Sequence, residues 1–273
     1  YLVLGRRSDG PVEAVLLSLG SLTRGETITT RGHVYRHDVA VGYDRRLRSF
    51  VSSLGGDLGG ACLPDGIWMD ADSVRALEHE IRLVPTRDAS WVRIVSRGPR
   101  LVRADTPDGV LAVSEGAGAA ARLLLRYLER RRDDPWGSFR TLRAHEFGHL
   151  VELRRHLPIA RGWRASLTLL AESRFSLEVA ERALEMRAQL AAVAESPDPD
   201  LALAEMLVTI PVHEAEPDPH DAGYEMAVRR MLRHVHGRPD LYPQIERGYR
   251  ILPQLDRLTD AQIRQAARAV LPR

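Results

Sequence analysis

The feature that most constrains the fold of this chain is a change of pattern near its middle. From Ala117 onward the apolar residues recur at helical spacing, whereas most of the earlier part carries short β-type runs separated by turn signals. Strands that precede helices in this way are typical of the α+β class, because the two kinds of element then form separate layers. We therefore expect a small antiparallel sheet followed by a mostly helical half.

The same patterns predict where individual elements lie. In the second half we expect helices over 117–132, 137–157, 166–172, 177–194, 200–209, 221–236, 241–250 and 260–271. Before them, 72–83 is expected to be a helix with Ser73 as its cap, 90–97, 100–105 and 109–115 an antiparallel meander, and "GGDLGGACLPDG" (55–66) a loop. A boundary at 66–72 would separate a β-rich region of unknown role (1–70) from a second domain (71–273).

Composition limits the classes of partner. All 39 basic residues are Arg, 37 acidic residues balance them, and no basic stripe interleaved with aromatics appears, so we expect no nucleic-acid binding. No apolar run approaches the roughly 20 residues of a membrane span, so we expect a soluble protein. Arginine without lysine indicates a G+C-rich, bacterial genome. The chain opens on Tyr1 and not Met, which is compatible with a removed export leader, and the compartment and oligomeric state are not predicted.

One stretch carries chemistry: "RAHEFGHLVEL", residues 143 to 153. It lies in a predicted helix that ends in a basic turn before Pro158. Positions four apart lie on one face of a helix, so His145 and His149 can aim both imidazoles at one point with Glu146 beside it. This is the H-E-x-x-H arrangement, in which two histidines bind Zn²⁺ and the glutamate acts on a bound water.

Over residues 90 to 192 the chain resembles the zincin metallopeptidases, and within them the gluzincins, whose third ligand is a glutamate. The resemblance implies a zincin-like active-site helix with His145 and His149 as metal ligands to Zn²⁺, Glu146 as general base, and a peptide or protein substrate cut at a peptide bond. It also implies that an edge strand binds the substrate backbone. "GVLAVSEG" (109–116) is the candidate for that strand, although a plain core strand fits it equally well.

The third ligand is expected on the following helix. His149 lies about 12 Å before the end of its own helix, so an antiparallel partner that begins at Leu177, capped by Ser176, would place its ninth residue beside His149. That residue is Glu185. "EMRAQL" then supplies Ala188 and Gln189, where some gluzincins carry a small residue followed by Asp or Asn, so Gln189 departs from their pattern.

Other third ligands remain open. Glu172 would take the place of Glu185 if 166–194 formed one continuous helix. Cys62 would take it in an arrangement like that of the peptide deformylases, although its flanking residues do not match theirs. His156 is excluded, because it lies about 10 Å further along the same helix than His149.

Catalysis by such a site needs a further hydrogen-bond donor for the developing oxyanion. His213, His220 and Tyr224, in and after an acidic loop, are the candidates. Two alternatives to a zinc peptidase stay open. One is a non-catalytic zincin-like module for binding or sensing, and the other is a helical domain that carries the motif by accident.

Overall fold

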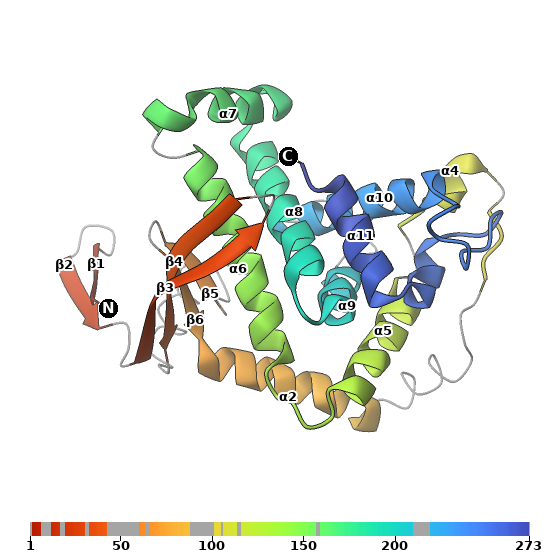
Figure 1. Cartoon of the computed structure of the whole chain (residues 1–273), viewed down its shortest axis with the longest axis horizontal. Helices are drawn as coiled ribbons and strands as arrows, with labels where there is room; N and C mark the ends of the chain where they lie inside the picture. The colour runs from red at the N-terminus through yellow and green to blue at the C-terminus, as the bar shows by residue number, and fades with distance from the viewer. Residues whose placement is uncertain are drawn as a thin grey trace.

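The computed structural model confirms the α+β class (Figure 1). It describes residues 2–6, 12–16, 20–30, 33–42, 60–63, 66–87, 101–104, 106–113, 116–156, 159–209 and 219–272. Strands come first along the chain and helices follow, as the change of pattern predicted.

The N-terminal strands form two sheets. β1 (Leu2–Arg6) and β2 (Val12–Leu16) make an antiparallel hairpin. A second sheet has the order β3-β4-β6-β5, built from β3 (Gly20–Thr30), β4 (His33–Gly42), β5 (Gly60–Leu63) and β6 (Gly66–Asp70).

In the four-stranded sheet, β3 pairs with β4 and β5 pairs with β6 in antiparallel fashion. β4 and β6 run parallel, so this sheet is mixed. Short connections join β3 to β4 and β5 to β6, which forces those pairs to be antiparallel, whereas the long stretch after β4 leaves room for a parallel return. β5 also corrects the loop predicted over 55–66. It has few strand-forming residues and owes its conformation to its pairing with β6.

The four-stranded sheet packs against the helix that carries the motif. Val39, Ile67 and Met69 lie in one buried apolar cluster with Phe147 and Leu150 of α6 (Gly137–His156). The predicted boundary coincides with the junction between β6 and α2 (Ala71–Arg87), yet this cluster joins both sides of it. The division into two domains therefore stays a prediction.

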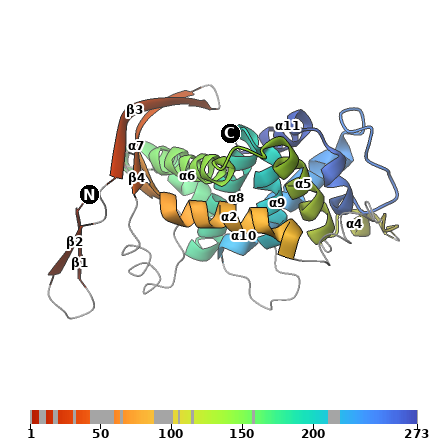
Figure 2. The same cartoon turned by 90° about the horizontal axis from the view of Figure 1, so that it is seen from below.

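The first turn of α2 is capped by Asp70 rather than by the predicted Ser73. The Asp70 carboxylate accepts from the backbone N–H of Asp72 at 3.0 Å and from the Ser73 hydroxyl at 2.5 Å. Seen from below, α2 crosses the face of the helical half in front of α6 and α8 (Figure 2).

The predicted meander is wrong where the structure describes it. Residues 88–100 lie outside the described part, and Arg103 makes only an isolated bridge to Tyr249. The third strand is replaced by a short helix, α4 (Pro107–Val110). Here the Thr106 hydroxyl accepts from the backbone N–H of Gly109 at 3.0 Å, and Val110 is buried in the helical core. Local capping and burial thus override the β-type composition.

Most of the helical half follows the prediction, although the helix predicted over 166–172 begins earlier, at Ile159, and a 3₁₀ helix near the C-terminal end was not predicted. Its elements are α5 (Ala117–Arg130), α6, α7 (Ile159–Glu172), α8 (Leu177–Glu195), α9 (Pro199–Thr209), α10 (Pro219–Gly237), the 3₁₀ helix η1 (Leu252–Arg257) and α11 (Asp260–Val270). The helix predicted over 241–250 is wrong, because that stretch is a series of turns. Pro243 lacks a backbone N–H and Gly248 adopts a φ of 84°, both unfavourable in a helix.

α8 and α9 lie at the centre of this half (Figure 1). Leu190 and Val193 of α8 and Leu203 of α9 are completely buried among side chains of α5, α10 and α11. Among the residues that the structure describes, none of the helices has the length and apolar character needed to cross a bilayer.

Candidate metal centre

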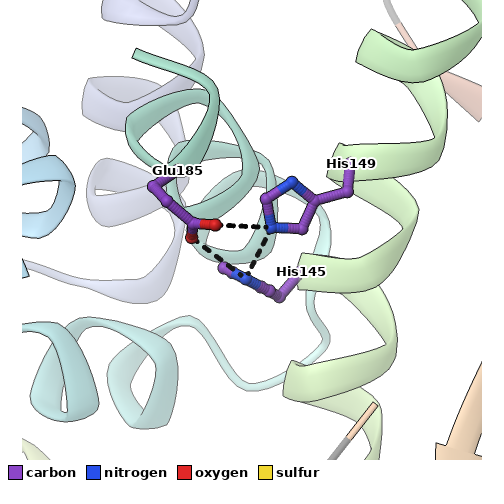
Figure 3. A group of neighbouring side chains, drawn as sticks. All are labelled: His145, His149 and Glu185. Atoms are coloured by element: carbon purple, nitrogen blue, oxygen red, sulfur yellow. Dashed lines mark hydrogen bonds and ion pairs between the residues drawn. The ribbon is translucent and has the colours of Figure 1, made fainter. Parts of the chain in front are cut away.

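α6 presents the two motif histidines from a rigid, well-capped helix. Its first turn is closed by Glu78 of α2, whose carboxylate accepts from the Ser138 backbone N–H at 3.0 Å and from the Ser138 hydroxyl at 2.9 Å. Its last turn carries the predicted basic residues. Because 145 and 149 are one turn apart, both imidazoles leave the same face of α6 and point toward α8 (Figure 3).

α7 and α8 are separate helices, which decides between the two glutamates. The break falls at Arg174 and Phe175, whose φ values of 52° and 62° lie in the left-handed region. α8 then starts at Leu177, and the Ser176 hydroxyl accepts from the backbone N–H of Val179 at 3.4 Å, as the capping prediction required. The continuous helix that Glu172 needed is therefore absent. Glu172 is the last residue of α7, and its side chain lies outside the described part.

The structure brings His145, His149 and Glu185 together, with ligand atoms that lie within 4.8 Å of one another (Figure 3). The two Nε2 atoms are 3.1 Å apart. Glu185 places one oxygen 3.3 Å from Nε2 of His149 and the other 3.6 Å from Nε2 of His145. This cluster could hold a metal ion.

Small residues let the helices approach closely enough for these distances. A Cβ atom on Gly148 would lie 2.7 Å from the Ala188 Cα, so α6 and α8 are in backbone contact one residue before His149. The close approach is at Ala188, the small residue that was predicted to let the two helices come together. A Cβ on Gly223 of α10 would lie 2.6 Å from the Glu185 Cβ, so α10 packs directly behind the third ligand.

Gln189 orients His145. Its Oε1 lies 3.0 Å from the His145 Nδ1, and its Nε2 donates to the Ala202 backbone carbonyl of α9 at 3.1 Å. Because a carbonyl can only accept, the amide nitrogen must face Ala202 and the amide oxygen must face the imidazole. Nδ1 of His145 then carries the proton, and Nε2 presents its lone pair to the cluster. Gln189 stands where some gluzincins carry Asp or Asn, and it still supplies a hydrogen-bond acceptor for His145.

Glu146 is buried beside the cluster and lies under strand β5. A Cβ on Gly60 would come within 2.8 Å of the Glu146 Cγ, so only a glycine lets this strand pass. Burial raises the pKa of Glu146 to about 7, the charge of His149 opposes the rise, and the Glu185 carboxylate adds to it. A carboxyl group with such a pKa can both accept and return a proton near neutral pH.

His149 and Glu185 form a coupled pair. Burial disfavours the charged imidazole, but the carboxylates of Glu185, Glu146 and Glu152 together outweigh it and raise the pKa of His149. The negative charge of Glu185 therefore favours positive charge in this space, whether a proton or a metal ion supplies it.

Of the three predicted oxyanion donors, the structure describes the side chain of Tyr224 only. Tyr224 of α10 is 8% exposed, and its ring stands edge-on to the His145 ring at 6.3 Å between centroids. Burial and the Glu185 carboxylate raise the pKa of Tyr224, so it keeps its proton. His220 is the second residue of α10, but its side chain lies outside the described part, as does His213 altogether.

Cys62 and His156 are not in the cluster of metal-binding groups found among the described residues. Cys62 lies on β5 and packs against the apolar cluster between sheet and α6, where burial raises the pKa of its thiol to about 12. The Nε2 atom of His156 lies 3.4 Å from a carboxylate oxygen of Glu152, and burial lowers the pKa of His156.

Sequence reasoning missed two features around the site. One is β5 with Gly60, since four residues rich in Gly and Ala carry no strand signal. The other is a buried ion pair between Glu152 of α6 and Arg187 of α8, with Nη1 2.8 Å from the carboxylate. Glu152 lies three positions after His149, and Arg187 lies two positions after Glu185. This closeness to the candidate ligands is the sequence signal that could have drawn attention to the ion pair.

Comparison of the chain with protein-family models, with curated proteins and with solved structures gave no match. The sequence motif and the geometry of the site are therefore the basis for assigning a function.

Proposed function

We propose that the protein is a zinc-dependent peptidase of the gluzincin type, with His145, His149 and Glu185 as the metal ligands. The observation that carries the proposal is the convergence of these three side chains, with the buried Glu146 beside them. The motif alone supplied two ligands, and the third comes from the separate helix on which it was expected.

The spacing of the ligand atoms fits zinc. With bonds of 2.0 to 2.1 Å and tetrahedral angles, zinc holds its ligand atoms about 3.3 Å apart. The two imidazole Nε2 atoms here are 3.1 Å apart, and they lie 3.3 and 3.6 Å from different oxygens of the Glu185 carboxylate, so the spacing is close to what zinc requires. Two imidazoles and one carboxylate are also the ligand set of many catalytic zinc sites, which keep a fourth position for water or substrate. Zinc bound there would supply Lewis acidity and a water of lowered pKa.

The residues of the chain divide the remaining work. The Glu146 carboxylate accepts the proton of the attacking water and delivers it to the leaving amine, a role that its pKa of about 7 suits. Tyr224, which stays protonated at neutral pH, donates from its hydroxyl to the developing oxyanion. Gln189 holds His145 in the tautomer that keeps Nε2 free of a proton.

The substrate-binding edge moves from 109–116 to β5. β5 is one of the two terminal strands of the four-stranded sheet in the described part of the chain, and it is the one that passes over Glu146. A peptide that adds to the outer edge of β5 would place its backbone next to Glu146. Gly60 is the residue that allows this approach.

Replacement of Glu146 by glutamine tests the proposal. The wild-type protein should bind one zinc per chain and cleave a mixed peptide library, and the Glu146→Gln variant should retain the zinc and lose at least 99% of the cleavage. Glu178→Gln makes the same change on the exposed first turn of α8 and should leave both properties unchanged.

Two results would contradict the proposal. Wild-type protein without bound zinc after purification free of chelators would remove the metal site. Zinc at one per chain without cleavage of any library peptide would instead favour the non-catalytic binding or sensing module.

A further inference from the structure

Exposed apolar side chains gather around the turn between α7 and α8. Of the nine large apolar side chains that are exposed in the described part of the chain, four lie within residues 167–179. These four form an apolar tip: Leu167 is 50% exposed, Phe175 74%, Leu177 75% and Val179 37%. α7 lies at the outer margin of the molecule, at the end of α6 and the start of α8 (Figure 1). Clustered apolar side chains on a surface mark a site of contact with something apolar.

The backbone of the turn is fixed by hydrogen bonds. The Phe175 N–H donates to the Leu170 carbonyl at 2.7 Å, and the Arg174 N–H donates to the Ala171 carbonyl at 3.1 Å. Arg174 and Phe175 adopt φ values of 52° and 62°, which are uncommon for residues other than glycine. Such a conformation persists only where the surrounding structure holds it. The exposure of Phe175 and Leu177 is therefore a property of a well-bonded turn.

The shape of the apolar tip limits what can cover it. Side chains that are three-quarters exposed protrude from the surface, whereas sites for small molecules are concave. A second copy of the chain placed on four side chains would bury far less than the roughly 800 Å² per partner of a stable interface. A lipid surface needs no matching partner surface, because protruding apolar side chains enter the boundary between headgroups and acyl chains. The shape therefore favours a lipid surface.

The charge around the apolar tip indicates which lipids would be bound. Residues 154–182 carry six arginines and three glutamates, an excess of three positive charges in a chain whose net charge is +2. Arg164 of α7 and Arg174 of the turn are both exposed, and Glu178 is paired with Arg182. An arginine at a bilayer surface keeps its guanidinium among the headgroups while its stem follows the apolar side chains. This excess of positive charge complements anionic headgroups.

We propose that the α7–α8 turn inserts its apolar tip into an anionic lipid surface, with Arg164 and Arg174 at the headgroups. The inference goes beyond the proposed peptidase activity and does not depend on it, because no group of the metal centre takes part. Glu185 follows Leu177 by eight residues, or about 12 Å along α8. Docking through the tip would therefore hold the candidate metal centre close to the membrane surface.

Sedimentation with lipid vesicles tests the proposal. Wild-type protein should bind vesicles of phosphatidylcholine mixed with phosphatidylglycerol more tightly than vesicles of phosphatidylcholine alone, and added salt should weaken that binding. The double variant Phe175→Asn, Leu177→Ser should bind the mixed vesicles at least about tenfold more weakly. Asparagine is chosen at 175 because it tolerates the left-handed region. Val208→Ser removes a side chain that is 70% exposed on α9 and should leave vesicle binding unchanged.

A second double variant tests the charges separately. Arg164→Gln with Arg174→Gln should weaken binding to the mixed vesicles about tenfold and leave binding to phosphatidylcholine vesicles unchanged. Glu146→Gln should bind vesicles as tightly as the wild type, so failure of the peptidase proposal and failure of the lipid proposal are distinguishable. Thermal unfolding reports whether each variant is folded.

Four results would overturn the proposal. The first is wild-type protein that sediments with neither kind of vesicle, and the second is equal binding to both kinds. The third is unchanged binding to the mixed vesicles in the Phe175→Asn, Leu177→Ser variant. The fourth comes from gel filtration without lipid: a wild-type dimer that this variant converts to a monomer would assign the apolar tip to a second copy of the chain.

Discussion

Replacing Gln189 by leucine separates the orientation of His145 from the presence of the ligand itself. Gln189 makes two hydrogen bonds, one to Nδ1 of His145 and one to the Ala202 carbonyl. Leucine fills a similar volume but leaves Nδ1 without its acceptor. Loss of the hydrogen-bond partner of a metal-binding histidine costs about 10- to 100-fold in metal affinity, or about 1.4 to 2.7 kcal/mol.

The assay is a competition titration of zinc against a chromophoric chelator, with wild type and variant compared at one pH. The matched control is Gln254→Leu, since Gln254 is also fully buried and bonds the backbone of Glu246 and Arg250 far from the metal centre. Both variants should lose stability, but only Gln189→Leu should lose zinc affinity. An equal zinc affinity in wild type and Gln189→Leu would refute the tautomer argument.

Three further predictions follow from the same region. Gly148→Ala should destabilise the protein by about 1 to 3 kcal/mol in denaturant titrations and weaken zinc binding, because the new methyl group pushes α6 away from α8. Gly237→Ala is the control and should change neither property, because a Cβ there would have nothing within 4 Å. Glu152→Gln should cost about 3 to 5 kcal/mol of unfolding free energy by removing the negative charge that the buried Arg187 guanidinium contacts, and near-normal stability would contradict the buried ion pair. In metal-free protein the raised pKa of Glu146 gives a contribution to stability that is complete below pH 4.5 and lost as the pH rises to about 7. The stability difference between wild type and Glu146→Gln should therefore fall by up to about 3 kcal/mol over that range, and a difference independent of pH would contradict it.

The cluster of candidate metal ligands could be predicted because each of its residues depends on a local signal. His145 and His149 need only the period of one helix. Glu185 follows from the cap at Ser176 and the rise per residue of a helix, both of which the sequence displays. Glu172 remained open until the left-handed residues Arg174 and Phe175 were seen, since no glycine marks that break.

The elements that failed depend on contacts between distant residues. β5 is a strand because β6 pairs with it, and its four residues, Gly60–Leu63, lie between glycine- and proline-containing turn signals. The stretch 109–115 has the composition of a strand, but Thr106 starts a helical turn and the core accepts Val110 in that form. Tertiary context of this kind is not visible in periodicity.

The most direct test of the metal centre is the zinc content and zinc affinity of wild type beside Glu185→Ala and Glu172→Ala. We expect one zinc per chain in wild type and in Glu172→Ala. Glu185→Ala should lose at least about 100-fold in zinc affinity, because it removes the only carboxylate that the described part of the chain places with the two imidazoles. Retention of full zinc affinity in Glu185→Ala would contradict the account.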